Sequence, residues 1–141
     1  MKKYFLPIIL LCSIVLSGCV ATTKDRVLDS DEESQLQKRS YQTRVFDTAD
    51  KDKVMRATVS TLQDLGFLVN QANFQLGTIT ATKMDGYTTK ATVNVRQKGQ
   101  KQMSVRINAQ FNNAPVTEPQ HYQNFFASLE KSLFLTAHAG E

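Results

Sequence analysis

The chain has 141 residues, of which 41% are hydrophobic and 21% charged, and a formal net charge of +4. This composition fits one small domain with a single core. Two of the positive charges come from Lys2 and Lys3. Apart from Lys98 and Lys101, no basic cluster is interleaved with aromatic residues, which argues against a nucleic-acid-binding protein.

The first 18 residues have the organisation of a secretory signal peptide. Lys2 and Lys3 form a positive n-region, and the almost continuously apolar run 4–16 is too short for a membrane-spanning helix, which needs roughly 20 apolar residues. The run leads into Leu-Ser-Gly-Cys at 16–19, which resembles a bacterial lipobox. This resemblance implies cleavage before Cys19 after a diacylglyceryl group has been attached to its sulfur. We therefore expect Cys19 to be a lipid anchor.

The residue after Cys19 bears on the membrane that holds the anchor. Bacterial lipoproteins with Asp at this place tend to stay in the inner membrane, and here the place is taken by Val20. The resemblance thus implies an outer-membrane lipoprotein whose folded part faces the periplasm. With Cys12 lost in the signal and Cys19 acylated, no thiol remains for a disulfide, a thiolate metal site or a nucleophile.

Residues 19–40 are rich in Thr, Ser, Gln and charged side chains, so we expect a lipidated flexible tether. About 20 such residues place the domain roughly 25 Å from the membrane by random-coil scaling. The alternative is a segment that folds on a partner, with Leu28 and Leu36 as its main apolar contacts.

The domain itself is expected to span 41–141 and to open with a short strand at 41–46. Residues 50–65 then show helical spacing, with an apolar stripe of Val54, Met55, Val59, Leu62 and Leu65. The N-cap candidates are Asp47, Thr48 and Asp50. Gly66 predicts a left-handed end to the helix, over which Phe67 packs.

Strands are expected at 77–84, 87–97 and 102–112, and 67–70 can add another short one. The dipeptide Asp85-Gly86 suits a two-residue hairpin turn between the first two. Along 102–112 apolar and polar residues alternate strictly, which predicts a sheet with one dry face and one wet face.

A loop with Pro115 and Pro119 precedes a second helix, for which Thr117 and Gln120 form a possible capping box. Its inner side is expected to carry Tyr122, Phe125, Phe126, Leu129, Leu133 and Phe134. The order of elements is then β-α-β-β-β-β-α. Because only one face of the sheet is apolar, we expect an α+β fold with both helices packed on one side of an antiparallel sheet.

Residues 46–83 resemble the repeated domain of the BamC family, lipoproteins of the outer-membrane β-barrel assembly machinery. The shared features are an aspartate-started helix with an apolar stripe, a Gly-Phe-x-Val segment, a polar turn and a Gly-x-Ile strand start. They fall here on Asp47, Val54, Val59, Leu62, Leu65, Gly66, Phe67, Val69, Gly77 and Ile79. The resemblance implies a helix-grip fold, with the sheet curled round the C-terminal helix, in a single-domain relative with a shorter tether.

No constellation of residues points to catalysis. His121 and His138 are the only histidines, and we expect no carboxylate at ligand spacing beside either. The glycines lack phosphate-binding spacing, and no Ser lies in a nucleophile-elbow context. We therefore expect no enzyme activity, no cofactor and no metal site.

The features together favour an outer-membrane lipoprotein that binds another envelope protein, as an accessory or stabilising subunit of an assembly, secretion or efflux complex. The candidate contact residues, which two strands turn away from the core, are Thr92, Asn94, Arg96, Ser104, Arg106, Asn108 and Gln110. Short polar groups cost little to desolvate when a partner bonds them, and arginines form forked bonds to carboxylates. The alternative for these residues is a solvated sheet face.

A second hypothesis is a carrier of a lipid or another small apolar ligand. Its pocket would lie between sheet and long helix and be lined by Val93, Ile107, Phe125, Phe126 and Leu129. The same side chains can instead fill the core of so small a domain. Surface display as an adhesin or an immunity factor is a third possibility, and the sequence indicates neither the partner nor the oligomeric state.

Overall fold

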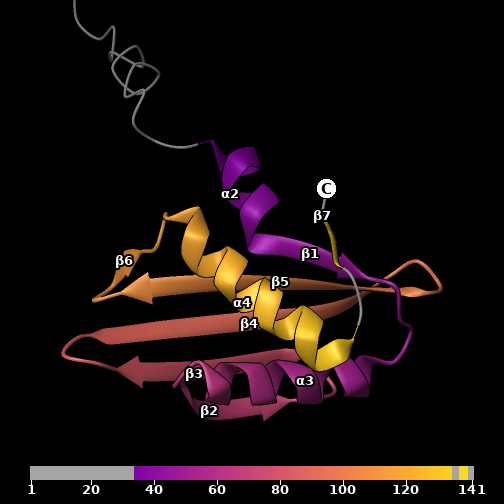
Figure 1. Cartoon of the computed structure of the whole chain (residues 1–141), viewed down its shortest axis with the longest axis horizontal. Coiled ribbons are helices and arrows are strands. Elements are labelled where there is room, and N and C mark those ends of the chain that lie inside the picture. Colours follow the sequence, from indigo (N-terminus) through magenta and orange to yellow (C-terminus); the bar gives the residue numbers. More distant parts are fainter. Residues whose placement is uncertain (1–33, 135–136, 140–141) are drawn as a thin grey trace, which may run out of the picture. The chain divides into compact units, whose positions relative to one another are not determined.

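The computed structural model describes residues 34–134 and 137–139, and Glu33–Glu141 form one compact unit (Figure 1). The signal peptide, Cys19, Val20 and the tether as far as residue 33 lie outside the described residues.

The unit begins with a helix that the composition of the tether did not predict. Helix α2 (Gln35–Gln42) starts with a capping box, in which the Ser34 hydroxyl accepts from the Gln37 backbone and the Gln37 side chain accepts from the Ser34 backbone. Residues 35–40 therefore belong to the folded unit rather than to a flexible tether. The expected strand at 41–46 is shortened to β1 (Thr43–Phe46).

Helix α3 (Lys51–Asp64) follows the sequence prediction closely. The Asp50 carboxylate accepts from the Lys53 backbone and caps the first turn. At the other end Gly66 has φ +82°, and the Phe67 backbone donates to the Leu62 carbonyl at 2.8 Å. Together with the 2.9 Å bond from the Gly66 N–H to the Gln63 carbonyl, this bond forms a Schellman motif, which ends the helix and leaves Phe67 packed against the core.

The remaining strands are β2 (Leu68–Asn73), β3 (Thr78–Met84), β4 (Thr88–Lys98), β5 (Gln102–Phe111), β6 (Ala114–Pro115) and β7 (Ala137–Ala139). Among the described residues they form, with β1, one seven-stranded antiparallel sheet of order β2-β3-β4-β5-β1-β7, and β6 pairs with β5. Strand β7 includes His138.

Helix α4 (Pro119–Leu133) crosses the sheet diagonally (Figure 1). Its N-cap is Glu118, which makes no capping bond through its side chain, so the expected capping box of Thr117 and Gln120 is not formed. Pro119 occupies the first turn, where its missing N–H costs nothing. Phe134 ends the helix with φ +54° and is 93% exposed, so it does not belong to the inner face.

Both α3 and α4 lie on the same side of the sheet (Figure 1). Their buried side chains form one core with the inward residues of the strands, including Val93, Val105, Phe126 and Leu129. The protein is thus an α+β domain whose antiparallel sheet is packed by helices on one side, as the alternation of apolar residues predicted.

Candidate functional site

We call the side of the sheet opposite α3 and α4 the outer face. Along β5 the residues Met103, Val105 and Ile107 are buried on the helix side, and the residues between them are half-buried on the outer face. Strand β4 alternates in the same way, with Val93 and Val95 buried. The wet face predicted from the sequence is therefore present.

The strand register places the candidate contact residues next to one another. Asn94 lies opposite Arg106, and the other pairs across β4 and β5 are Thr92 with Asn108 and Arg96 with Ser104. Gln110 is opposite Lys90 and continues the row. All seven candidate residues therefore lie on one continuous patch of the outer face, formed by two neighbouring strands.

Strand β3 extends this patch with residues that the sequence analysis did not include. Thr78, Thr80 and Thr82 lie opposite Asn94, Thr92 and Lys90. The sequence "TITATKM" did indicate these positions, because its threonines alternate with residues that point inward. The outer face is thus a broad surface of threonine, asparagine, glutamine and serine across three strands.

Charge is unevenly distributed between this sheet and the rest of the domain. Strands β1 to β5 contain no acidic residue, whereas Lys90, Arg96, Lys98 and Arg106 share the outer face. The described acidic residues lie in loops, turns and helices and are Asp47, Asp50, Asp52, Asp64, Asp85, Glu118 and Glu130. Neither Arg96 nor Arg106 forms an ion pair with a described residue. The outer face is therefore cationic.

Arg106 is the most constrained cation of the patch. It is half-buried between Asn94 on β4 and Thr43 on β1, which both lie opposite it. Its Nε atom is buried and has no hydrogen-bond acceptor among the described residues. A buried donor without an acceptor is uncommon in folded proteins.

The five residues expected to line a carrier pocket are buried in the core. Val93, Phe126 and Leu129 are almost fully enclosed by their neighbours. Phe125 and Ile107 also line an open groove on the helix side, at the end of the sheet where β3 and β5 finish.

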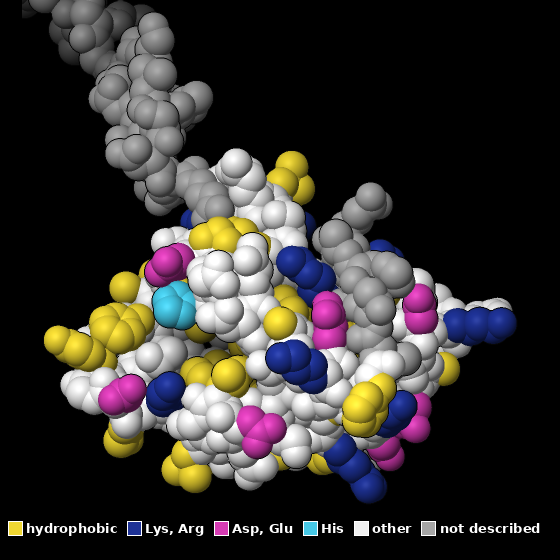
Figure 2. All heavy atoms as spheres, in the orientation of Figure 1, with side chains coloured by type: hydrophobic (Ala, Val, Ile, Leu, Met, Phe, Trp, Pro, Cys, Tyr) yellow, Lys and Arg dark blue, Asp and Glu magenta, His cyan; other side chains and the backbone are white. Residues whose placement is uncertain are grey.

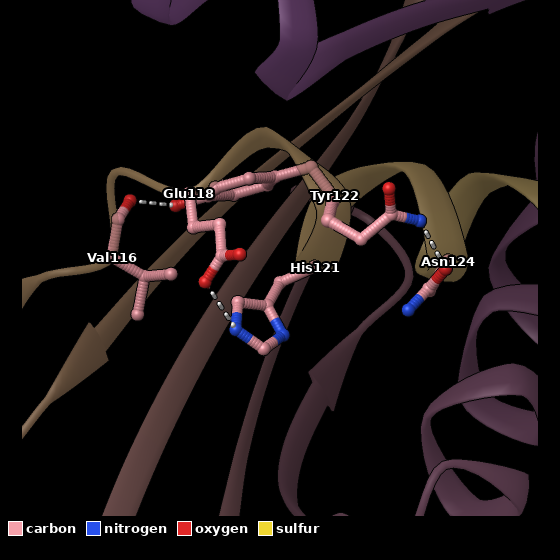
Figure 3. A network of polar contacts seen from close by, with 6 residues as sticks. Val116, Glu118, His121, Tyr122 and Asn124 are labelled. Atoms are coloured by element: carbon pink, nitrogen blue, oxygen red, sulfur yellow. Dashed lines mark hydrogen bonds and ion pairs between the residues drawn. The ribbon is translucent and has the colours of Figure 1, made fainter.

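The described residues hold no group of three or more His, Cys, Asp or Glu side chains that could bind a metal ion. His121 does have a neighbouring carboxylate, contrary to the expectation from the sequence. Its Nε2 lies 3.3 Å from an Oε2 of Glu118, three residues earlier in the chain (Figure 3). Both side chains are about two-thirds exposed, so the pair is a surface contact at the start of α4.

A scan against protein-family models and a search of curated proteins both give no match for this chain. No helix among the described residues combines the length and the apolar character that crossing a membrane requires.

Proposed function

We propose that this protein is a lipid-anchored subunit of the bacterial outer membrane that binds another envelope protein through the outer face of its sheet. In this role it acts as an accessory or stabilising component of an assembly, secretion or efflux complex. The lipobox at residues 16–19 and the BamC-like pattern at residues 46–83 support the proposal.

The observation that carries the proposal is the composition of the outer face. It combines unpaired cations with short uncharged polar groups and has no carboxylate in its strands. Such groups lose little on desolvation once a partner satisfies their hydrogen bonds. The complementary surface is therefore one rich in aspartate or glutamate, to which Arg96 and Arg106 offer forked hydrogen bonds.

Reversing the charge of the outer face should remove the partner. We expect Arg106→Glu to weaken the complex by about 2–5 kcal/mol, because a carboxylate would then face the partner's carboxylates in a desolvated contact. Arg96→Glu, at an exposed position, should act in the same direction with less risk to the fold. The measurement is co-purification of partner proteins from solubilised membranes, with a thermal melt of each variant.

The matched control is Arg56→Glu, the same charge reversal at an exposed position of α3 on the opposite side of the sheet. It should leave the set of co-purifying proteins unchanged. A partner that is retained when both Arg96 and Arg106 are reversed would contradict binding at the outer face.

The anchor is tested separately through Cys19→Ser. A hydroxyl cannot take the thioether-linked diacylglyceryl group, so we expect no fatty-acid label and either an unprocessed precursor or a soluble periplasmic protein. Metabolic labelling and membrane fractionation measure both outcomes. A Ser variant that is still acylated and still sediments with the outer membrane would contradict the lipobox assignment.

A further inference from the structure

The two helices diverge across the inner face of the sheet. Near the end of α4 they are joined, because the Thr61 hydroxyl of α3 lies 3.2 Å from the Ser132 hydroxyl of α4. Toward the start of α4 they separate and leave the ends of β3 and β5 between them (Figure 1). In this region Figure 2 shows hydrophobic side chains lying in a hollow of the surface.

The hollow is a groove of about 430 Å³. Its apolar lining comes from both helices and the sheet and includes Leu62, Phe67, Ala91, Ile107, Ala109 and Phe125. The volume lies within the range of ligand sites in proteins, which are typically concave, mainly apolar and about 300–1,000 Å³.

The groove is deep because the sheet carries small side chains beneath it. Ala81, Ala91 and Ala109 are in register across β3, β4 and β5 and form a row of small side chains on the inner face. Larger residues continue the same strands further along, among them Val93 and Ile107. The inner face of the sheet thus carries only small side chains at the place where the two helices separate, and this leaves space for the groove.

Several polar side chains of the groove form bonds within the chain. The Tyr122 hydroxyl donates to the Val116 carbonyl at 2.6 Å, and Asn124 accepts from Gln120 at 2.9 Å (Figure 3). On the opposite wall the Lys83 ammonium donates to the Leu65 carbonyl. These bonds reduce the hydrogen-bonding capacity that the three side chains offer to a sugar or a nucleotide.

The mouth of the groove adds exposed aromatic surface. Tyr87 and Phe111 lie with ring centroids 5.1 Å apart and are 62% and 42% exposed. Asp85, beside them, is exposed and keeps the mouth in contact with solvent. The groove therefore has an apolar interior and a solvent-exposed opening, where Asp85 supplies a charged group beside the two aromatic rings.

We propose that this groove binds the hydrocarbon tail of an amphiphile, such as the acyl chain of a lipid, and leaves its polar head in solvent at the mouth. A hydrocarbon tail needs no hydrogen bonds from the lining, and burial of its methylenes supplies the affinity. The groove lies on the helix side of the sheet, so binding there is independent of the outer face.

The first test measures how affinity depends on tail length. The full chain, with Cys19→Ser so that it carries no acyl group of its own, is titrated with the fluorescent fatty acid cis-parinaric acid, which is then displaced by saturated fatty acids of 6 to 16 carbons. Affinity should rise by up to about fourfold for each added methylene, at ~0.8 kcal/mol per buried CH₂, until the groove is full. Absence of probe binding, or displacement that does not depend on tail length, would overturn the proposal.

The second test fills the groove from its floor. Ala109→Phe should lower affinity for the probe at least tenfold, whereas Asn108→Phe, the same bulk on the adjacent outward position, should leave it unchanged. Phe111→Ser at the exposed mouth should lower affinity severalfold without touching the core, which keeps the test decisive if Ala109→Phe unfolds. Equal affinity in Phe111→Ser and the unchanged protein, or equal loss in the Asn108 control, would place the probe elsewhere and overturn the assignment.

Discussion

Gly77→Ala should lower the free energy of unfolding by about 2–5 kcal/mol. Gly77 has φ +70°, and a Cβ built there would lie 2.2 Å from the backbone carbonyl oxygen of Val95. The left-handed conformation alone costs an L-residue about 1–2 kcal/mol. Moving the chains apart would also weaken the 2.7 Å bond from the Val95 N–H to the Gly77 carbonyl, at about 1–3 kcal/mol for a buried group left unpaired. Urea unfolding followed by circular dichroism measures the loss.

Gly86→Ala separates the two contributions to this loss. Gly86 also has φ +70°, but no heavy atom lies within 4 Å of its added Cβ. It should therefore cost only the conformational part, about 1–2 kcal/mol. If both variants lost the same free energy of unfolding, the close approach of Gly77 to β4 would contribute nothing to stability.

Phe126→Ala should be the most costly truncation in helix α4, at about 3–5 kcal/mol. The side chain is 2% exposed and packs between the helix and the sheet. Its ring also lies 5.2 Å from the guanidinium carbon of Arg44, a cation–π contact that ties β1 to the helix. Truncation therefore leaves a cavity and removes this contact. Chemical denaturation measures the resulting total loss in the free energy of unfolding.

Phe134→Ala is the matched control, because it removes the same side chain from the end of the same helix. Phe134 is 93% exposed, so its truncation should change stability by no more than about 0.5 kcal/mol. A large loss at Phe134 would mean that this residue packs against part of the chain after all.

The sequence predicted those elements whose signals are local. In β4 and β5 strict alternation determined both the strands and the face of each residue. In α3, Asp50 at the start and the Gly66-Phe67 pair at the end are themselves the capping residues. The same reasoning placed the outer-face candidates correctly, because alternation and register follow from the pattern of a single hairpin.

Helix α2 shows how composition can outweigh a local signal. Ser34 and Gln37 stand at capping-box spacing, yet they lie in a polar segment, and the large apolar residue between them, Leu36, is exposed. What stabilises the helix is tertiary, since Tyr41 packs on Tyr122 of α4 with ring centroids 5.1 Å apart. A single-sequence pattern does not contain that contact.

The sequence predicted a pocket between the sheet and the long helix, and Ile107 and Phe125 do line the groove, but its position could not be predicted, for a similar reason. The sequence indicated which residues of α4 face the sheet, but the angle between α3 and α4 depends on packing over the whole core. The alanines of β3, β4 and β5 are unremarkable one by one and gain meaning only from the register that aligns them. Helix spacing likewise assigned Phe134 to the inner face, because periodicity does not show where a helix ends.

Strand β1 has consequences for how the chain is made. Both of its partners come late in the sequence, since Thr43 pairs with Arg106 of β5 and Arg44 with Ala139 of β7. Pairing between residues so far apart is slow, because a long loop must close before the contacts form. A nascent chain that has not reached β5 has no neighbour for β1, and one that stops before β7 leaves an open edge that can pair with other chains. Synthesis must therefore be nearly complete before all strands of the sheet can pair. Truncated products should aggregate rather than accumulate as smaller folded domains.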